Sequence, residues 1–258
     1  MQDALIEIMR EAGALALSFF GTPLKTWVKD FNSPVTEADI AVDLLLRDRL
    51  SKLAPDAAWL SEESVDDLAR LAAPRLWIVD PIDGTRAYMS GKTDWTIVAA
   101  LVEGGRPILA SVFAPVANQM FIARKGKGTS VNGRSVSVSG GDDVESARVA
   151  GPNPQLDRLA KIFPRMEKAD KVHSLALRLA RVADGTLDAA FASSASRDWD
   201  LAAADLLVHE AGGALTNLAG DGLQYNRVDT AHGALLAAGL SRHRALLDAL
   251  VMKRAPSA

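Results

Sequence analysis

Residues 77–84 constrain the fold of this chain more than any other stretch of its sequence. They begin with an apolar run that predicts a buried strand, and this run leads directly into Asp80, Pro81 and Asp83. Pro81 fixes its own φ and restricts the residue before it, while Gly84 permits a sharp turn. The two carboxylates can therefore converge on one point, and oxygen ligands at such a point select a hard cation.

Three further groups of the same segment extend this candidate site. The carbonyl oxygen of Ile82 lies between the two aspartates in the sequence, so it is a third candidate ligand. The amide groups of Gly84 and Thr85 begin the next segment and offer an anion site at a helix N-terminus beside the cation. In isolation, however, Asp-Pro-x-Asp-Gly is also the sequence of an ordinary surface turn.

Other acids lie next to apolar runs elsewhere in the chain. Glu62 and Glu63 directly follow the apolar stretch AAWL, although two adjacent acids can also simply be solvated. Asp200 lies at the start of a nearly all-apolar helix, where it can equally serve as the N-cap. Thr36 and Asp39 have the spacing of a capping box, and taken alone this pair is better explained by that structural role.

Composition excludes several classes of protein. The chain has 258 residues, of which 48% are hydrophobic, so it can bury a substantial core. Its 29 Lys and Arg against 32 Asp and Glu give a net charge of -3, which excludes the basic field needed to bind a nucleic-acid duplex. The absence of cysteine leaves oxygen or histidine as metal ligands and fits a reducing compartment.

The N-terminal segment, residues 1–20, predicts an amphipathic surface helix and not a signal peptide. Charged residues between Asp3 and Glu11 interrupt its apolar run, and no small-residue cleavage site follows. No apolar stretch of the chain is long enough to span a bilayer. We therefore expect a cytoplasmic protein that makes no membrane contact.

The order of predicted strands and helices indicates a mixed α+β protein with two lobes. Residues 94–138 have the pattern of an antiparallel sheet with Gly-rich turns, and beyond them strands alternate with helices. We place the boundary where the pattern loosens, which gives an N-terminal lobe, residues 1–140, and a C-terminal lobe, residues 141–258. The first lobe carries most candidate ligands, and the second contributes Asp200 and substrate contacts.

Two other features are better explained by structure than by function. The four histidines include no pair at the spacing of metal ligands, so core or surface positions are expected for all of them. The Gly-rich segment Lys125–Gly128 follows a strand but opens no helix. It therefore predicts a hairpin turn and not a phosphate loop.

Together, the acidic motifs resemble those of the inositol monophosphatase superfamily along nearly the whole chain. Four stretches match in order and spacing, namely VTEAD, SEES, WIVDPIDGT and DWDLAAADLLVHEAGG. The resemblance implies a layered α/β/α/β/α sandwich that is usually a homodimer. It also implies two or three Mg²⁺ ions, for which Mn²⁺ can substitute, held by Glu62, Asp80, the Ile82 carbonyl, Asp83 and Asp200.

The resemblance also implies a reaction, the hydrolysis of a phosphate monoester. Thr85 and Asp39 orient the attacking water, Glu62 shares in catalysis, and the turn at Gly84 and Thr85 binds the phosphate. Paired metal ions about 3.5–4 Å apart can activate a water, neutralise the phosphoryl oxygens and support the leaving oxygen. Direct in-line attack of water then needs no protein nucleophile. Glu63 is implied to lie outside the direct ligands.

The partner implied is a small-molecule phosphate ester. Inositol-specific members usually carry an acidic residue shortly before the Trp-Asp pair, whereas residues 192–197 are ASSASR here. Residues 83–115 look closer to the bacterial 3'(2'),5'-bisphosphate nucleotidase (CysQ-like) branch. Arg86, Lys92 and Arg197 are candidates for contact with a second phosphate, although each is also readily explained as a solvated charge.

Three alternatives and one departure from the family pattern stay open. The chain can be an inositol-1-monophosphatase or a histidinol-phosphate phosphatase, since both activities occur on this fold. From a different class, it can be a non-catalytic protein whose acidic cluster holds a structural cation. His173 is the departure, because a glycine is often found before Ser174 in the family.

Overall fold

The computed structural model describes residues 1–28 and 34–252. In this part of the chain, no helix is long and apolar enough to cross a membrane. The helices are α1 (Gln2–Phe19), α2 (Glu37–Leu53), α3 (Thr85–Met89), α4 (Asn153–Ala160), α5 (Leu175–Ala183), α6 (Asp198–Glu210) and α7 (Leu240–Met252).

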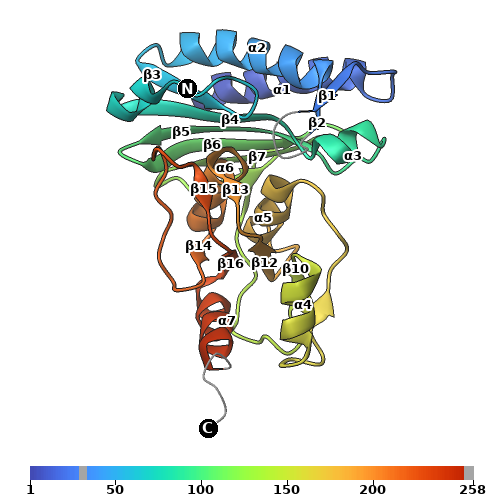
Figure 1. Ribbon diagram of the computed structural model, residues 1–258. Coiled ribbons are helices and arrows are strands. Elements are labelled where there is room, and N and C mark those ends of the chain that lie inside the picture. Colours follow the sequence, from blue (N-terminus) through green and yellow to red (C-terminus); the bar gives the residue numbers. More distant parts are fainter. Residues whose placement is uncertain (29–33, 253–258) are drawn as a thin grey trace.

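Two sheets organise the fold (Figure 1). The larger sheet has the strand order β3 (Ala57–Ser61), β4 (Arg75–Asp83), β5 (Thr96–Glu103), β6 (Arg106–Ala114), β7 (Gln119–Arg124), β8 (Thr129–Val131) and β9 (Arg134–Val136). The smaller has the order β11 (Glu167–Lys168), β10 (Arg148–Ala150), β12 (Ala189–Ala192), β16 (Leu235–Gly239) and β14 (Gly213–Asn217). Two short antiparallel pairs complete the set: β1 (Thr26–Val28) with β2 (Pro34–Thr36), and β13 (Ser196–Arg197) with β15 (Ala231–His232).

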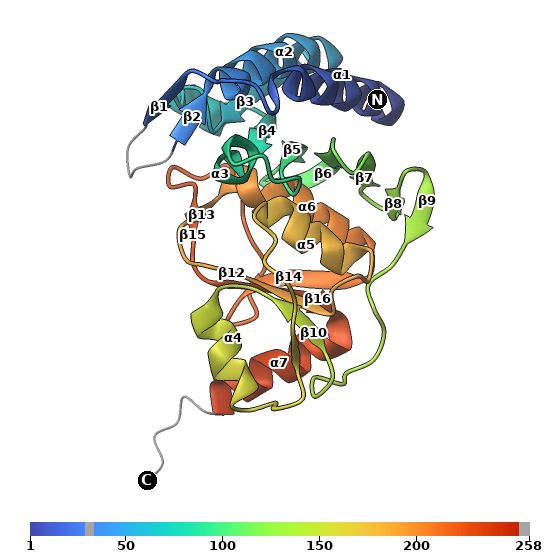
Figure 2. The ribbon, with the colours of Figure 1, turned by 90° about the vertical axis from the view of Figure 1, so that its right-hand side faces the viewer.

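The elements stack in alternating layers of helix and sheet (Figures 1 and 2). Helices α1 and α2 cover one face of the larger sheet, and α5 and α6 lie between the two sheets. Helices α4 and α7 cover the outer face of the smaller sheet. The α/β/α/β/α sandwich expected from the sequence is confirmed.

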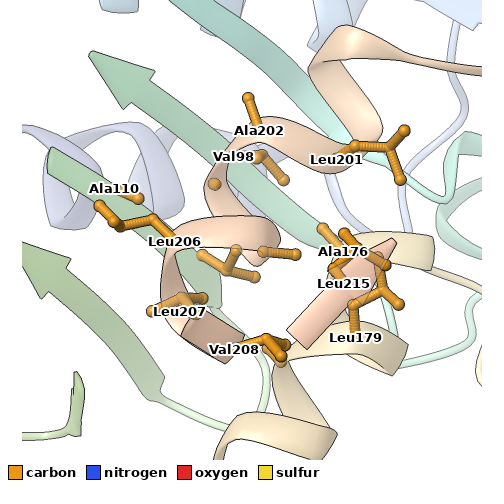
Figure 3. Packing of buried hydrophobic residues seen from close by; sticks show 14 of the residues in the cluster. Val98, Ala110, Ala176, Leu179, Leu201, Ala202, Leu206, Leu207, Val208 and Leu215 are labelled. Carbon is orange, nitrogen blue, oxygen red and sulfur yellow. The ribbon is translucent and has the colours of Figure 1, made fainter. Parts of the chain in front are cut away.

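Helix α6 forms the centre of the core because it is buried on every side. All its residues from Leu201 to Val208 are buried, as expected for a helix that is apolar nearly all round. Figure 3 shows α6 between Val98 and Ala110 of the larger sheet and Leu215 of the smaller sheet. Contact with both sheets fixes the position of this helix and therefore of the acidic residues in its first turn.

The proposed lobe boundary falls between the two sheets in the sequence. The larger sheet uses residues 57–136, and the smaller sheet uses residues 148–239. Residues of α5 and α6 nevertheless share one hydrophobic cluster with strands of both sheets. The division into lobes at residue 140 stays a prediction.

The tight packing of β14 generates a test of the core. A Cβ added at Gly213 would lie 2.8 Å from the carbonyl oxygen of Ala238 and 2.9 Å from methyl groups of Val138 and Val208. We expect Gly213→Ala to lower the free energy of unfolding by about 1–3 kcal/mol, because a strand or helix must shift to make room. Urea denaturation followed by circular dichroism measures this loss. The control is Gly140→Ala, where nothing lies within 4 Å and the stability should stay unchanged.

Candidate active site

Three aspartates from two distant parts of the sequence meet where β4 and α6 approach each other. Asp80 and Asp83 belong to the end of β4, and Asp200 belongs to the first turn of α6. Each offers one carboxylate oxygen, and these oxygens all lie within 4.8 Å of one another. Asp80 and Asp83 are buried, and Asp200 is partly buried. We call these three residues the aspartate trio.

The geometry of Asp80 depends on an irregularity in β4. We expected the strand to end at the aspartates, but β4 continues to Asp83 and shifts its register against β5 between Asp80 and Asp83. Pro81 lies in this bulge, since it has no N–H to donate to a neighbouring strand. The backbone N–H of Ile82 donates instead to Asp80 Oδ1 at 3.0 Å, which fixes the carboxylate of Asp80.

Asp83 is held by the N-terminus of α5. The Ser174 hydroxyl donates to Asp83 Oδ2 at 2.6 Å, and the backbone N–H of Ala176 donates to the same oxygen at 2.7 Å. The N–H of Leu175 lies 3.2 Å from Asp83 Oδ1. The hydroxyl of Thr96 lies 2.8 Å from that of Ser174, so it can fix the orientation of the serine.

The sequence did not predict this positioning role of Ser174. Ser174 is the N-cap of α5, and a serine before an apolar run is a recognisable N-cap signal. Nothing in that local pattern reports that the cap also contacts Asp83, a residue far away in the chain. The missing information was the packing of α5 against β4 and β5.

Asp200 lies inside α6 and not at its N-cap, which was the position that the sequence allowed for it. The N-cap of α6 is Arg197, so Asp200 is the third residue of the helix and not the cap. Its Oδ2 accepts a hydrogen bond from the backbone N–H of Arg197 at 2.6 Å. The N-cap interpretation of Asp200 is therefore wrong, because the helix begins three residues earlier than that interpretation requires.

Asp39 and Thr85 also come together at this site. The predicted capping box is present, since Asp39 Oδ2 accepts from the Thr36 backbone N–H at 2.8 Å. The other oxygen of Asp39 lies 3.2 Å from the hydroxyl of Thr85, and this hydroxyl lies 3.1 Å from the carbonyl oxygen of Ile82. Asp39 thus caps α2 and contacts Thr85 with the same carboxylate.

Burial disfavours ionisation throughout the trio, and charge repulsion adds to this effect at Asp80 and Asp200. Burial, followed by the charges of Glu62 and Asp83, raises the pKa of Asp80 well above its usual range. Burial and the charge of Asp83 likewise raise the pKa of Asp200. Burial raises the pKa of Asp83 as well, while its hydrogen bonds from the start of α5 act in the opposite direction. A bound cation would remove this electrostatic cost.

The two adjacent glutamates lie close to the trio but outside it. The backbone N–H of Glu62 donates to Val79 O at 3.3 Å, which ties the turn after β3 to the neighbouring strand β4. The charges of Glu62 and Glu63 both raise the pKa of Asp80. The ligand role of Glu62, and the lesser role of Glu63, stay predictions.

The remaining predicted contacts lie around this centre. Gly84 has a φ of 98° and is the N-cap of α3, so its place in the turn depends on the conformational freedom of glycine. Arg86 is exposed on α3. The guanidinium of Arg197 lies 3.3 Å from Thr230 Oγ1 and 3.6 Å from a carboxylate oxygen of Asp229.

The Gly-rich segment forms the predicted hairpin turn, between the antiparallel strands β7 and β8. Backbone N–H groups of Gly126 and Gly128 donate to the carboxylate of Glu210 at 2.8 and 2.9 Å, and that of Lys127 at 3.1 Å. The turn thus binds an anion, but the anion is a side chain at the end of α6.

Comparisons with known proteins indicate one family of phosphatases. The family model described as Inositol monophosphatase family matches residues 1–255 of this chain. A fructose-1,6-bisphosphatase/inositol-1-monophosphatase from Thermotoga maritima is 33% identical over 226 residues, which cover 84% of this chain and 85% of that protein. A 3'(2'),5'-bisphosphate nucleotidase CysQ from Aggregatibacter actinomycetemcomitans is 28% identical over 245 residues, or 88% of this chain and 87% of the relative.

A solved structure shows the same architecture. The extragenic suppressor protein suhB from Bartonella henselae superimposes with a TM-score of 0.85 at 26% identity, over 96% of this chain and 97% of that one. The match extends over both sheets and all the layers that surround the trio. The chain belongs to the inositol monophosphatase family.

Proposed function

We propose that this chain is a Mg²⁺-dependent phosphatase that hydrolyses a 3'(2'),5'-bisphosphate nucleotide. One observation carries the metal-dependent part of the proposal, namely the approach of the Asp80, Asp83 and Asp200 oxygens to within 4.8 Å of one another. Carboxylates so close together repel one another unless a cation or protons neutralise them. In a family of phosphatases, a catalytic metal ion is the natural occupant of such a site.

The donor set fits a hard divalent cation. The trio, Glu62 and the Ile82 carbonyl provide only oxygen atoms, which are the ligands that Mg²⁺ and Mn²⁺ prefer. We propose that these groups hold two or three ions. When bound, Mg²⁺ neutralises charge on the phosphate and lowers the pKa of a water molecule.

Thr85 and Asp39 are proposed to orient the attacking water. The Thr85 hydroxyl can direct its proton to Asp39, at 3.2 Å, and its oxygen can then accept a hydrogen bond from water. The capping box fixes Asp39 in turn, so the hydroxyl keeps one orientation. Burial raises the pKa of Asp39, as expected for a carboxylate kept away from bulk water. Gly84 and Thr85 are proposed to bind the phosphate itself.

The choice of substrate rests on two observations. A relative that covers most of this chain carries the name 3'(2'),5'-bisphosphate nucleotidase. In addition, residues 192–197 contain no acid that would bind the hydroxyl groups of an inositol ring. The name of the Thermotoga relative favours a second candidate, an inositol monophosphatase.

We also propose that the protein is located in the cytoplasm and forms a homodimer.

The first prediction concerns the metal. Hydrolysis should require Mg²⁺ or Mn²⁺ and should be lost in excess EDTA, because all the proposed ligands are oxygen atoms. Phosphate release from adenosine 3',5'-bisphosphate, with and without each ion, measures this requirement. Full activity in excess EDTA contradicts the proposed mechanism, and metal binding without hydrolysis of any phosphomonoester supports a non-catalytic cation-binding protein.

The next prediction separates two acids that look alike in sequence. Asp83→Asn should lower kcat by more than about 100-fold, because it removes the charge of a proposed metal ligand and replaces with an NH2 group one of the two oxygens that accept from the α5 N-terminus. Glu63→Gln should cost about tenfold or less, because Glu63 lies outside the trio. Steady-state kinetics at saturating Mg²⁺ measures both losses, with circular dichroism to verify folding. Equal and small losses in the two variants contradict the assignment.

A third prediction concerns the second phosphate of the substrate. If Arg86 or Arg197 contacts it, the alanine variant should raise KM for adenosine 3',5'-bisphosphate about tenfold and change kcat less. A charge-assisted hydrogen bond contributes ~1.5–3 kcal/mol, which gives an effect of this size. The control substrate is adenosine 3'-monophosphate, and the control variant is Arg134→Ala, at an exposed position on β9. An unchanged ratio of the two activities in both variants excludes these arginines as specificity residues.

A further inference from the structure

A lysine, a histidine and an aspartate form a chain of contacts beside the active site. The Nζ of Lys92 lies 2.9 Å from His173 Nε2. On the other side of the ring, His173 Nδ1 lies 2.7 Å from Asp94 Oδ2, and this oxygen also accepts from the His173 backbone N–H at 2.7 Å. Asp94 therefore fixes both the backbone and the ring of His173.

The chemistry of the three groups determines the direction of these hydrogen bonds. An ammonium group only donates, so Nε2 of His173 is the acceptor of the Lys92 contact. Nδ1 then carries the proton and donates it to the carboxylate of Asp94. These contacts run from the Lys92 cation through the neutral imidazole of His173 to the Asp94 anion, and they hold the Lys92 side chain in one direction.

This chain of contacts is directly connected to the aspartate trio. Ser174, which follows His173, donates its hydroxyl to Asp83 Oδ2, and its backbone N–H donates to the carbonyl oxygen of Asp94 at 3.1 Å. A Cβ added at Gly84 would lie 3.4 Å from Ser174 N, so the proposed phosphate-binding turn packs against the same backbone. Lys92 and His173 thus lie beside the proposed reaction centre and not among its ligands.

The charge of Lys92 is available to a ligand. Within residues 1–28 and 34–252, Lys92 forms no ion pair with a carboxylate, and its single contact to His173 leaves two of its three protons uncommitted. The segment just before His173 borders a cavity of about 320 Å³, whose walls include Asn153, Lys171, Arg178 and Ser193. Pockets for small molecules begin at about this size, and this cavity lies against the residues that lead into His173.

We propose that Lys92, positioned by His173 and Asp94, is a specificity residue that binds an anionic group of the substrate other than the phosphate being hydrolysed. The inference rests on the proposed function only in that the substrate must carry such a group. His173 acts here as a positioning residue, because it touches Lys92 and not the substrate. A histidine at this position has a use that glycine cannot supply, since glycine has no side chain to hold the lysine.

The test compares substrates that differ in one phosphate. Lys92→Gln should raise KM for adenosine 3',5'-bisphosphate about tenfold, while KM for adenosine 3'-monophosphate and kcat for both change less than about twofold. Lys92→Arg should retain most of the preference for the bisphosphate. His173→Ala should act in the same direction, and it should add nothing further to Lys92→Gln. The control is Lys127→Gln, an exposed lysine in the β7–β8 turn.

Two outcomes overturn the inference. If Lys92→Gln affects the two substrates equally, or lowers kcat and not affinity, Lys92 merely ties the segment after α3 to α5. If the wild-type protein prefers no bisphosphate to its matched monophosphate, Lys92 has no second anion to recognise. The same assays with fructose 1,6-bisphosphate and fructose 1-phosphate separate the inference about Lys92 from the proposal that the substrate is a nucleotide. A preference for this sugar bisphosphate that Lys92→Gln abolishes supports the inference, even if the nucleotide is not hydrolysed and the nucleotidase proposal fails.

Discussion

Repulsion among three carboxylates is the constraint on which the rest of the site depends. Each member of the trio accepts a backbone N–H hydrogen bond, from Ile82 to Asp80, from the first turn of α5 to Asp83 and from Arg197 to Asp200. These bonds favour the ionised forms, yet burial still raises all three pKa values, and repulsion adds to it at Asp80 and Asp200. The fold therefore holds the carboxylates together against their own electrostatics, and a cation would remove the remaining cost.

The layered architecture explains how distant parts of the sequence reach this point. Helices α5 and α6 lie between the two sheets, and both begin near the end of β4. Because α6 is buried on every side, a displacement of Asp200 would require movement of both sheets. The first turn of α5 is fixed in the same layer, so Asp83 receives its hydrogen bonds from a rigid element. The packed core thus fixes the positions of Asp83 and Asp200 relative to each other.

Local patterns in the sequence predicted many of the elements, and the family resemblance indicated the three aspartates that the structure brings together, whereas contacts between distant segments were not predictable. The buried strand before Asp80, the capping box at Asp39 and the hairpin at residues 125–128 each depend on neighbouring residues alone. The hydrogen bond from Ser174 to Asp83 depends on how α5 packs, and so does the contact between Lys92 and His173. One sequence without aligned relatives contains no signal for such pairs.

Structural and chemical interpretations of an acidic residue are not alternatives in this fold. Asp39 completes a capping box and also contacts Thr85, because the start of a helix presents both N–H groups and its first-turn side chains in one direction. The turn at residues 126–128 and the start of α5 both donate backbone N–H groups to a carboxylate. Glu210 satisfies the turn as a single anion, whereas Asp83 shares its surroundings with two other acids. Only the second arrangement leaves negative charge that backbone donors do not neutralise, and this surplus makes it the candidate metal site.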